Sequence, residues 1–349
     1  MERQTGKRIA AGMLCLLFLF TAGCSGGNEE NKVQGDVRGE VRTENLSEGQ
    51  KTGTKEKKQL KKASTPQFTP NGIRSVSLRK DGEEFLHILR EPAEYKMSFD
   101  YWEIVNPYDE NVTMDTEVMF QMFEELCSLA FDTPVRIEEG TETGIQGSET
   151  GFTVEYVDAC DDTAARNTDG PDTVIEILLG EEDGKGGRYA AAAGSEEQVY
   201  ILPEAVLQMV YGRKPFDYIL KIPVLISVDT LKNIEITTRG SRYEIQVDVA
   251  GNSYRFGKKK IEKEEFASLY QAISGVMLVS EADGERSMGK EEPDLDVIYH
   301  RNTEGAPEVQ VSYYPYDDEF DSVEINGREW FLVRKEDVEA LIEQVEKAF

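Results

Sequence analysis

The side chains best suited to chemistry are few in this chain and stand far apart. It contains two histidines and four cysteines among 349 residues. His87 lies between two apolar residues, and His300 follows Tyr299. Neither histidine has a Cys or His partner at the spacing of a metal site. A Ser-His-Asp triad would need one of these two histidines, so we expect two structural histidines and no triad catalysis.

A glycine-rich stretch from Gly180 to Gly186 superficially resembles a phosphate-binding loop. It is one residue short between the framing glycines, and Lys185 is followed by glycine where Ser or Thr is needed. The three carboxylates within the stretch would also repel a phosphate. We therefore expect a hairpin turn that follows a strand.

Acidic and amide side chains between residues 158 and 169 indicate a weak cation site. Two of them fall at the third and fifth places of a calcium-binding loop, but Ala165 holds the first place, where Asp is needed. The segment that follows is typical of a strand, whereas the motif requires a helix. The candidate ligands are Asp158, Asp161, Asp162, Asn167 and Asp169. We expect no cofactor and no well-formed metal site.

Three tyrosines precede acidic residues near the C-terminus. They are Tyr313, Tyr314 and Tyr316, and two aspartates follow. The segment is typical of a turn with a solvated acidic end. Because tyrosine often anchors interfaces, the alternative is an interaction loop for a cationic partner or a glycan.

The N-terminus has the proportions of an export signal. Arg3, Lys7 and Arg8 precede an apolar run from residue 9 to residue 20, and small residues follow before Cys24. The apolar run is shorter than the roughly 20 residues that span a bilayer, and its length suits a secretory signal.

A cysteine directly after small residues resembles the bacterial lipobox, although Thr21 stands where leucine is usual. The resemblance implies that residues 1–23 are removed and that Cys24 becomes the diacylglyceryl-modified first residue. Two acyl chains hold a protein stably on a membrane. We expect a lipid anchor on the extracytoplasmic face of the cell membrane. A plain signal peptide or an uncleaved anchor is the alternative.

Export bears on the remaining cysteines. Cys15 lies in the signal, which leaves Cys127 and Cys160. Two cysteines in an exported chain favour a disulfide. However, Cys127 lies on the apolar stripe of a predicted helix and Cys160 lies in a polar loop, so a disulfide and two free thiols both stay open.

Charge and composition exclude several classes of protein. The chain has 67 acidic and 39 basic side chains, and its formal net charge is −28. This charge excludes nucleic-acid binding by phosphate neutralisation. The mean hydropathy of −0.49 excludes a polytopic membrane protein.

Residues 24–70 are predicted to form a disordered tether. They are rich in small polar and charged residues, so burial cannot offset the entropy lost on ordering. Lysines gather late in this segment, at Lys51, Lys55, Lys57, Lys58, Lys61 and Lys62. We expect a solvated linker, with attraction to anionic lipid or wall polymers as the alternative.

The remainder of the chain is predicted to contain two copies of one α+β unit, residues 71–213 and 214–349. Each copy begins with a hairpin, and each ends with a strand that leads directly into a helix. A mid-copy helix has apolar residues at three- and four-residue spacing. We expect two tandem repeats, each a mostly antiparallel β-sheet with helices packed on one face.

The predicted elements follow the same order in both copies. The first copy has strands over 73–89 (a hairpin), 94–99, 151–157 and 173–179, a helix over 112–131, and a strand and helix over 198–210. The second has strands over 234–249 (a hairpin), 252–256, 295–299 and 308–313, a helix over 262–275, and a strand and helix over 329–342. The aligned residues are Val76 with Ile234, Gly82 with Gly240, Tyr200 with Phe331, Ile201 with Leu332, Val206 with Val338 and Val210 with Ile342.

The first copy resembles the domain-of-unknown-function 4340 family of bacterial surface lipoproteins. The residues that carry the resemblance are Tyr101, Trp102, Ile104 and Pro107 before the first helix, Leu178 to Gly180 at a strand end, and Val199 to Ile201 at the entry to the next helix. The resemblance covers residues 73–235, with a weaker echo to the C-terminus. It implies an accessory protein of a membrane complex, encoded beside ABC-type export permeases, and it supplies no catalytic residues.

These observations favour a non-enzymatic interaction or accessory module, anchored to the membrane through Cys24. The expected partner is an ABC-type permease complex or another envelope protein. The alternative is a ligand- or cation-binding surface lipoprotein with its site between the two repeats.

Overall fold

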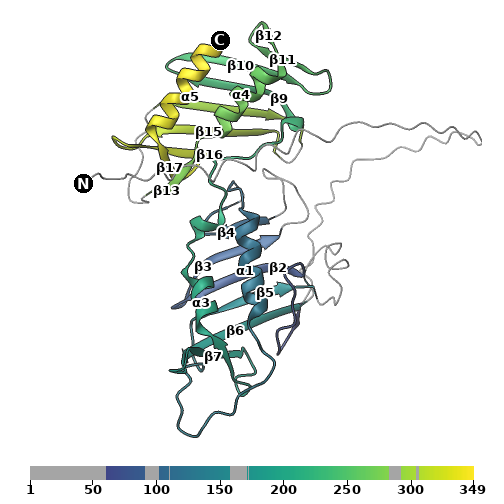
Figure 1. Cartoon of the computed structure of the whole chain (residues 1–349), viewed down its shortest axis with the longest axis vertical. Coiled ribbons are helices and arrows are strands. Elements are labelled where there is room, and N and C mark those ends of the chain that lie inside the picture. The colour runs from purple at the N-terminus through teal and green to yellow at the C-terminus, as the bar shows by residue number, and fades with distance from the viewer. Residues whose placement is uncertain are drawn as a thin grey trace, which may run out of the picture. The chain divides into compact units, whose positions relative to one another are not determined.

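The computed structural model describes residues 60–90, 102–109, 111–157, 171, 173–282, 292–303 and 306–349. They belong to one compact unit, Lys57–Phe349. The fold is α+β with two mostly antiparallel sheets (Figure 1), which confirms the coarser part of the predicted fold class, while the tandem repeat stays a prediction. No helix in these ranges has the length and apolarity needed to cross a membrane.

The first sheet contains the strands that precede residue 204. They are β1 (Lys61–Lys62), β2 (Ile73–Lys80), β3 (Glu83–Arg90), β4 (Trp102–Asn106), β5 (Gly151–Tyr156), β6 (Thr173–Glu182), β7 (Gly187–Ala192) and β8 (Tyr200–Pro203). Their order across the sheet is β4-β3-β2-β5-β6-β7-β8, and every pair in this order is antiparallel. β1 pairs with β6 in the parallel direction.

The first hairpin forms where the sequence predicts it. Val76 and Leu78 on β2 lie opposite Ile88 and Leu86 on β3, and all four side chains are fully buried. Asp81 and Gly82 turn the chain with φ values of 52° and 85°. Two successive positive φ angles are those of the type I′ turn, which matches the twist of the paired strands.

Two helices, α1 (Thr116–Ser128) and α3 (Glu204–Gly212), cover the apolar face of the first sheet (Figure 1). The carboxylate of Asp115 caps α1 by accepting the backbone N–H groups of Glu117 and Val118. The buried residues of α1 recur at helical spacing and are Met119, Met122, Phe123 and Leu126. The apolar stripe predicted for this helix is therefore confirmed.

The second sheet follows two short 3-10 turns, η2 (Pro215–Tyr218) and η3 (Val228–Thr230). Its strands are β9 (Leu231–Thr238), β10 (Ser241–Asp248), β11 (Ser253–Phe256), β12 (Lys259–Ile261), β13 (Leu278–Glu281), β14 (Leu295–Arg301), β15 (Glu308–Pro315), β16 (Phe320–Ile325) and β17 (Arg328–Arg334). Their order is β12-β11-β10-β9-β14-β15-β16-β17-β13. Two helices, α4 (Lys263–Ser274) and α5 (Lys335–Ala348), lie over one face of this sheet (Figure 1).

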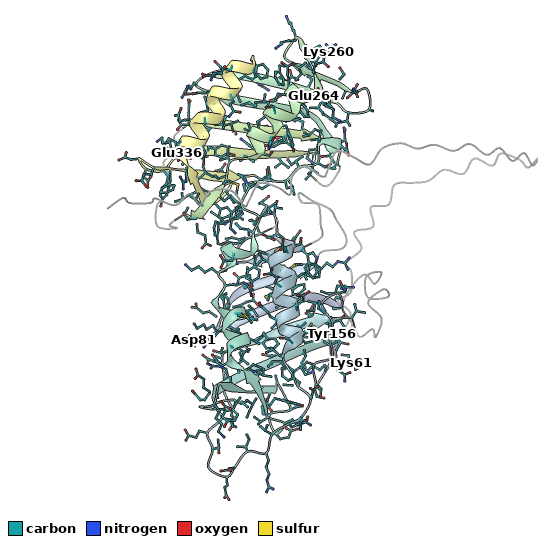
Figure 2. The ribbon with its side chains drawn as sticks, in the orientation of Figure 1. Lys61, Asp81, Tyr156, Lys260, Glu264 and Glu336 are labelled. Atoms are coloured by element: carbon teal, nitrogen blue, oxygen red, sulfur yellow. The ribbon has the colours of Figure 1, made fainter. Side chains whose placement is uncertain are left out.

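The folded unit begins before residue 71, which corrects the predicted end of the tether. Thr173 on β6 pairs with Lys61 on one side and with Tyr156 on the other (Figure 2). The ring of Phe68 packs against Tyr156 with 5.5 Å between centroids. The sequence did not predict this start because the segment is rich in lysine. The segment after residue 60 is ordered by only two strand residues and one aromatic ring.

The pairing of the last helices differs by one residue from the predicted alignment. α3 begins at Glu204 and α5 at Lys335, so counting from these starts pairs Leu207 with Val338 and Val210 with Leu341. These four side chains are all buried. The pair predicted from the sequence, Val210 with Ile342, is also buried on both sides, whereas Val206 is half-buried, so the alignment of the two copies stays a prediction.

Candidate functional site

Several predicted site residues lie outside the described residues. They are the lipidation residue Cys24, the cysteine Cys160 and the cation ligands Asp158, Asp161, Asp162, Asn167 and Asp169. The strand predicted over 94–99 also lies outside them. Among the described residues, no group of three or more His, Cys, Asp or Glu side chains is placed to hold a metal ion.

Cys127 lies on α1 and carries no disulfide within the described part of the chain. Its Sγ donates to the carbonyl oxygen of Phe68 at 3.5 Å. Burial raises the pKa of this thiol to about 12, and the nearby Glu124 carboxylate acts in the same direction. The disulfide with Cys160 stays a prediction.

The three tyrosines of the predicted interaction loop occupy different environments. Tyr313 lies within β15 and is 2% exposed, so it is a core residue and not a surface anchor. This corrects the prediction of one continuous aromatic loop. Tyr314 and Tyr316 are half-buried, and the turn itself begins after Pro315.

The stretch from Gly180 to Gly186 contains the end of β6 and the hairpin turn that leads to β7, as expected. One carboxylate oxygen of Asp183 accepts the backbone N–H of Lys185 at 2.7 Å and that of Gly187 at 2.8 Å. These bonds lower the pKa of Asp183. These two backbone N–H groups therefore bind the carboxylate of Asp183 and do not point toward a phosphate site.

The second sheet has a polar face on the side opposite α4 and α5. Side chains alternate between the two sides of a strand, and the strand register places one set together on this side. We call the polar residues of this set the polar face, among which Ile298 and Leu332 also lie; they are Glu235, Asp296, His300, Glu308, Gln310, Ser312, Tyr314, Ser322, Glu324 and Glu329. Polar residues at every second position of 308–314 signal this face in the sequence, which our sequence analysis missed.

A hydrogen-bonded cluster lies at the centre of the polar face. Asp296 Oδ1 accepts from Ser312 Oγ at 2.6 Å and from Gln310 Nε2 at 2.8 Å. Ser312 is fully buried, and the bond to Asp296 satisfies its hydroxyl. Asp296, Ser312 and Glu324 lie in one row across β14, β15 and β16.

Burial raises the pKa of two groups beside this cluster, Glu329 and Tyr314. The carboxylate of Glu324 adds to both shifts, because a like charge disfavours the ionised form. Hydrogen bonds with Ser322 and Ser312 oppose the shifts of Glu329 and Tyr314, respectively. The centre of the face is therefore rich in acceptors, suited to a partner that presents amines, guanidinium groups or hydroxyls.

His300 lies at the edge of the polar face between two carboxylates. Its Nε2 is 3.6 Å from Glu235 Oε1 on β9, and its Nδ1 is 3.3 Å from Glu308 Oε2 on β15. Glu235 also forms an ion pair with Arg242 on β10. The structural histidine expected from the sequence thus bridges three adjacent strands.

His87 lies on the first hairpin with different partners. Its Nε2 is 3.0 Å from Ser75 Oγ, and its Nδ1 is 3.5 Å from Glu84 Oε1. Glu84 also accepts a hydrogen bond from Ser77. Ser, His and Glu occur here in the order of a catalytic triad. However, Ser75 is only 4% exposed, so this contact ties β2 to β3 and presents no nucleophile to a substrate.

Asp321 is buried on the opposite side of the second sheet from the polar face, near the first turn of α5. It is 1% exposed, and Lys335 Nζ lies 3.8 Å from its Oδ1. Burial raises the pKa of Asp321 to about 6, and Asp294, Glu339 and Asp317 add to the shift. Lys335 acts in the opposite direction.

Residues of the two predicted copies contact one another through aromatic rings. Tyr108 of the first copy packs against Phe331 of the second with 5.2 Å between ring centroids. Phe216, which belongs to the second copy, packs against the same ring at 5.8 Å. The hydroxyl of Tyr108 donates to Glu281. Lys221 Nζ lies 4.2 Å from the centroid of the Phe216 ring. These contacts bury Tyr108 and Phe331 almost completely.

Comparison of the chain with protein-family models, curated proteins and solved structures yields no match.

Proposed function

We propose that the chain is a membrane-anchored extracytoplasmic lipoprotein that acts as a non-enzymatic interaction module. The observation that carries this proposal is the sequence before Cys24, in which basic residues, an apolar run and small residues follow one another, together with the polar segment after it. A diacylated cysteine on such a segment holds a folded domain near the membrane while leaving its surfaces free to meet a partner.

The polar face is the contact surface in this proposal. It offers carboxylates from several strands, with Asp296, Glu324 and Glu329 near its centre. The resemblance to the domain-of-unknown-function 4340 family supports an ABC-type export complex as the partner.

The proposal includes a tandem duplication of the α+β unit, which the strand order supports. The strands β2 to β8 of the first sheet can be numbered one to seven in chain order. Across the sheet they then lie in the order 3-2-1-4-5-6-7. The second sheet repeats this order, counting from β9 and leaving out β12 and β13. Both first hairpins also turn on two residues with positive φ, Asp81–Gly82 and Arg239–Gly240.

The anchor is tested by replacing Cys24 with serine in cells fed an alkyne-labelled fatty acid. We expect the native chain to carry the label and to sediment with membranes, and Cys24→Ser to lose both properties. Cys15→Ser, which changes a cysteine within the signal, is the matched control and keeps both. A Cys24→Ser chain that still carries the fatty acid would disprove the anchor.

The partner is tested by crosslinking on intact cells, followed by affinity purification and mass spectrometry. We expect a permease and its ATPase with the native chain and their loss with Glu324→Lys, which reverses a charge on the polar face. Glu336→Lys, on the exposed side of α5, is the control (Figure 2). Recovery of no envelope protein above background would count against the interaction module.

A further inference from the structure

The two histidines of the chain differ in what faces their ring nitrogens. Both nitrogens of His300 face carboxylate oxygens, at 3.6 Å from Glu235 and 3.3 Å from Glu308. One nitrogen of His87 faces Glu84, and the other faces the hydroxyl of Ser75. A carboxylate can only accept a hydrogen bond, whereas a hydroxyl can accept or donate one.

This difference sets which protonation state each site accommodates. A neutral imidazole has one N–H group, so at His300 its other nitrogen directs a lone pair toward a carboxylate. The imidazolium ion donates from both nitrogens and places a positive charge between two negative ones. At His87 the hydroxyl of Ser75 can donate to the neutral ring, so the neutral form is satisfied there.

We propose that Glu235, His300 and Glu308 form a proton-operated clasp that ties β9, β14 and β15 together when the ring is protonated. Histidine is the side chain whose charge ordinarily changes between about pH 5 and pH 8. The clasp is closed when the ring carries a proton on both nitrogens and open when the ring is neutral. The clasp goes beyond the proposed function and does not depend on the anchor or on a partner.

The charged groups on neighbouring strands favour the same behaviour. Arg242 on β10 pairs with Glu235, so Glu235 keeps a cationic partner when the ring is neutral. Glu308 has His300 as its ion-pair partner and loses that attraction. Glu244 on β10 and Asp296 on β14 lie on the same side of the sheet and add negative charge.

The clasp also changes what the polar face presents. When it is closed, the imidazolium ion neutralises part of the charge of Glu235 and Glu308. When it is open, the side chain of Glu308, already more than half exposed, becomes available to a cationic partner. A partner that binds through amines would therefore meet a more negative face at higher pH.

The clasp is tested by a double-mutant cycle on the full-length chain in detergent, with His300→Gln, Glu308→Gln and the double variant. Urea unfolding at pH 5.5 and pH 8 measures the coupling between the two residues. We expect a coupling of about three- to tenfold in the unfolding equilibrium constant at pH 5.5, and little coupling at pH 8. Equal coupling at the two pH values, or stronger coupling at pH 8, would overturn the clasp.

The matched control is the same cycle at the other histidine, with His87→Gln and Glu84→Gln. We expect the change in coupling between pH 5.5 and pH 8 to be smaller there, because Ser75 satisfies the neutral ring. A change as large as that at His300 would show that two flanking carboxylates are not required, and would contradict the proposed cause.

Nitrogen-15 labelling of histidine in the native chain provides a second readout, which needs no folded variant at position 300. Two histidines give two sets of ring signals, and the signals that disappear in His87→Gln identify His87. At pH 5.5 we expect both N–H protons of His300 to be visible and protected from exchange. A single N–H group on His300 at pH 5.5 would exclude the clasp.

Discussion

Asp321 makes the stability of the chain depend on pH. Its pKa rises from 3.8 to about 6 in the folded state, so the folded chain binds this proton more tightly than the unfolded chain. The resulting stabilisation is fully present below about pH 4 and is lost as the pH rises through about 6. A shift of this size corresponds to roughly 2–3 kcal/mol.

Replacing Asp321 with asparagine therefore has an effect that depends on pH. We expect Asp321→Asn to be more stable than the native chain by roughly 2 kcal/mol at pH 8, because no charge is buried. Near pH 4 the two proteins should have similar stability. Urea unfolding at both pH values measures the difference, and Asp318→Asn in the exposed turn is the control. Lower stability of Asp321→Asn at pH 8 would mean that the ion pair with Lys335 outweighs the cost of burial.

Cys127 is predicted to be chemically inert in the folded chain. The thiolate is the reactive form of cysteine, and burial raises the pKa of Cys127 to about 12. We expect iodoacetamide at pH 8 to leave Cys127 unmodified in the native chain and to modify it after unfolding in urea. Peptide mapping by mass spectrometry locates the label. A mass increase on reduction alone would reveal the predicted disulfide with Cys160 instead.

At the scale of elements, one arginine joins the two helices of the first sheet. Arg213 follows α3, and its Nη2 donates to Glu125 Oε1 on α1 at 2.7 Å. Its Nη1 donates to the other oxygen of Glu125. Both side chains are mostly buried, with exposed fractions of 22% and 16%. A paired, partly desolvated contact of this kind contributes more than a surface ion pair.

Removing this contact should weaken the first sheet measurably. We expect Arg213→Met to lower the free energy of unfolding by roughly 1–3 kcal/mol, because Glu125 keeps its charge without a partner. Arg213→Lys should recover part of the loss, since lysine cannot bind both oxygens in the same geometry. Arg334→Met is the control, because its pair with Glu336 is exposed, and it should change stability by less than about 0.5 kcal/mol. An equal effect of Arg213→Met and Arg334→Met would refute this reading.

The hairpin turns give a prediction that compares the two sheets. Gly82 and Gly240 have φ values of 85° and 75°, which side chains rarely adopt. Alanine at either position should destabilise the chain by about 1 kcal/mol. Gly212→Ala, at the end of α3 with open space around it, should stabilise the chain by about 0.5–1 kcal/mol. Thermal unfolding of the three variants checks the signs. Opposite signs at Gly82 and Gly240 would argue against equivalent turns.

Local signals explain which elements could be predicted. The hairpins follow from alternating apolar residues around a glycine, and α1 follows from its apolar stripe. β7 was not predicted because it ends in three alanines, which are not typical of strands. These alanines are nevertheless buried in the structure. β16 escapes because it contains Asp321 and Ser322, which are buried polar residues.

The polar face depends on contacts between distant parts of the chain. Glu235 and His300 meet because β9 lies beside β14, although 64 residues separate these two positions. Alternation along one strand shows which side chains share a side. It does not show which strands are neighbours. The site could therefore be predicted strand by strand, but not as an assembled surface.

At the scale of the whole molecule, the net negative charge, Asp321 and His300 all make the stability of the folded chain depend on pH. The chain carries a formal net charge of −28, and self-repulsion weakens as carboxylates take up protons. The protonation of Asp321 and the closing of the clasp at His300 both stabilise the folded state as the pH falls.

The native chain should therefore unfold at a higher temperature at pH 5.5 than at pH 8. Differential scanning calorimetry measures the two melting temperatures. Added salt should narrow the difference only in part, because it screens exposed charges more than buried ones. The combined variant Asp321→Asn, His300→Gln should show a smaller difference than the native chain. A melting temperature that is higher at pH 8 would contradict this account.

If the chain is held by a lipid on Cys24, as proposed above, the short strand β1 has a mechanical consequence. It is attached to β6 over two residue pairs, with one further hydrogen bond from Ala63 N–H to the carbonyl of Val174. A force applied at the proposed anchor would reach β1 before any longer strand. Detaching residues 60–72 would lengthen the segment between Cys24 and the sheet by roughly 40 Å at full extension. The antiparallel strand pairs of the first sheet would stay intact. β1 would therefore detach before the sheet itself unfolds.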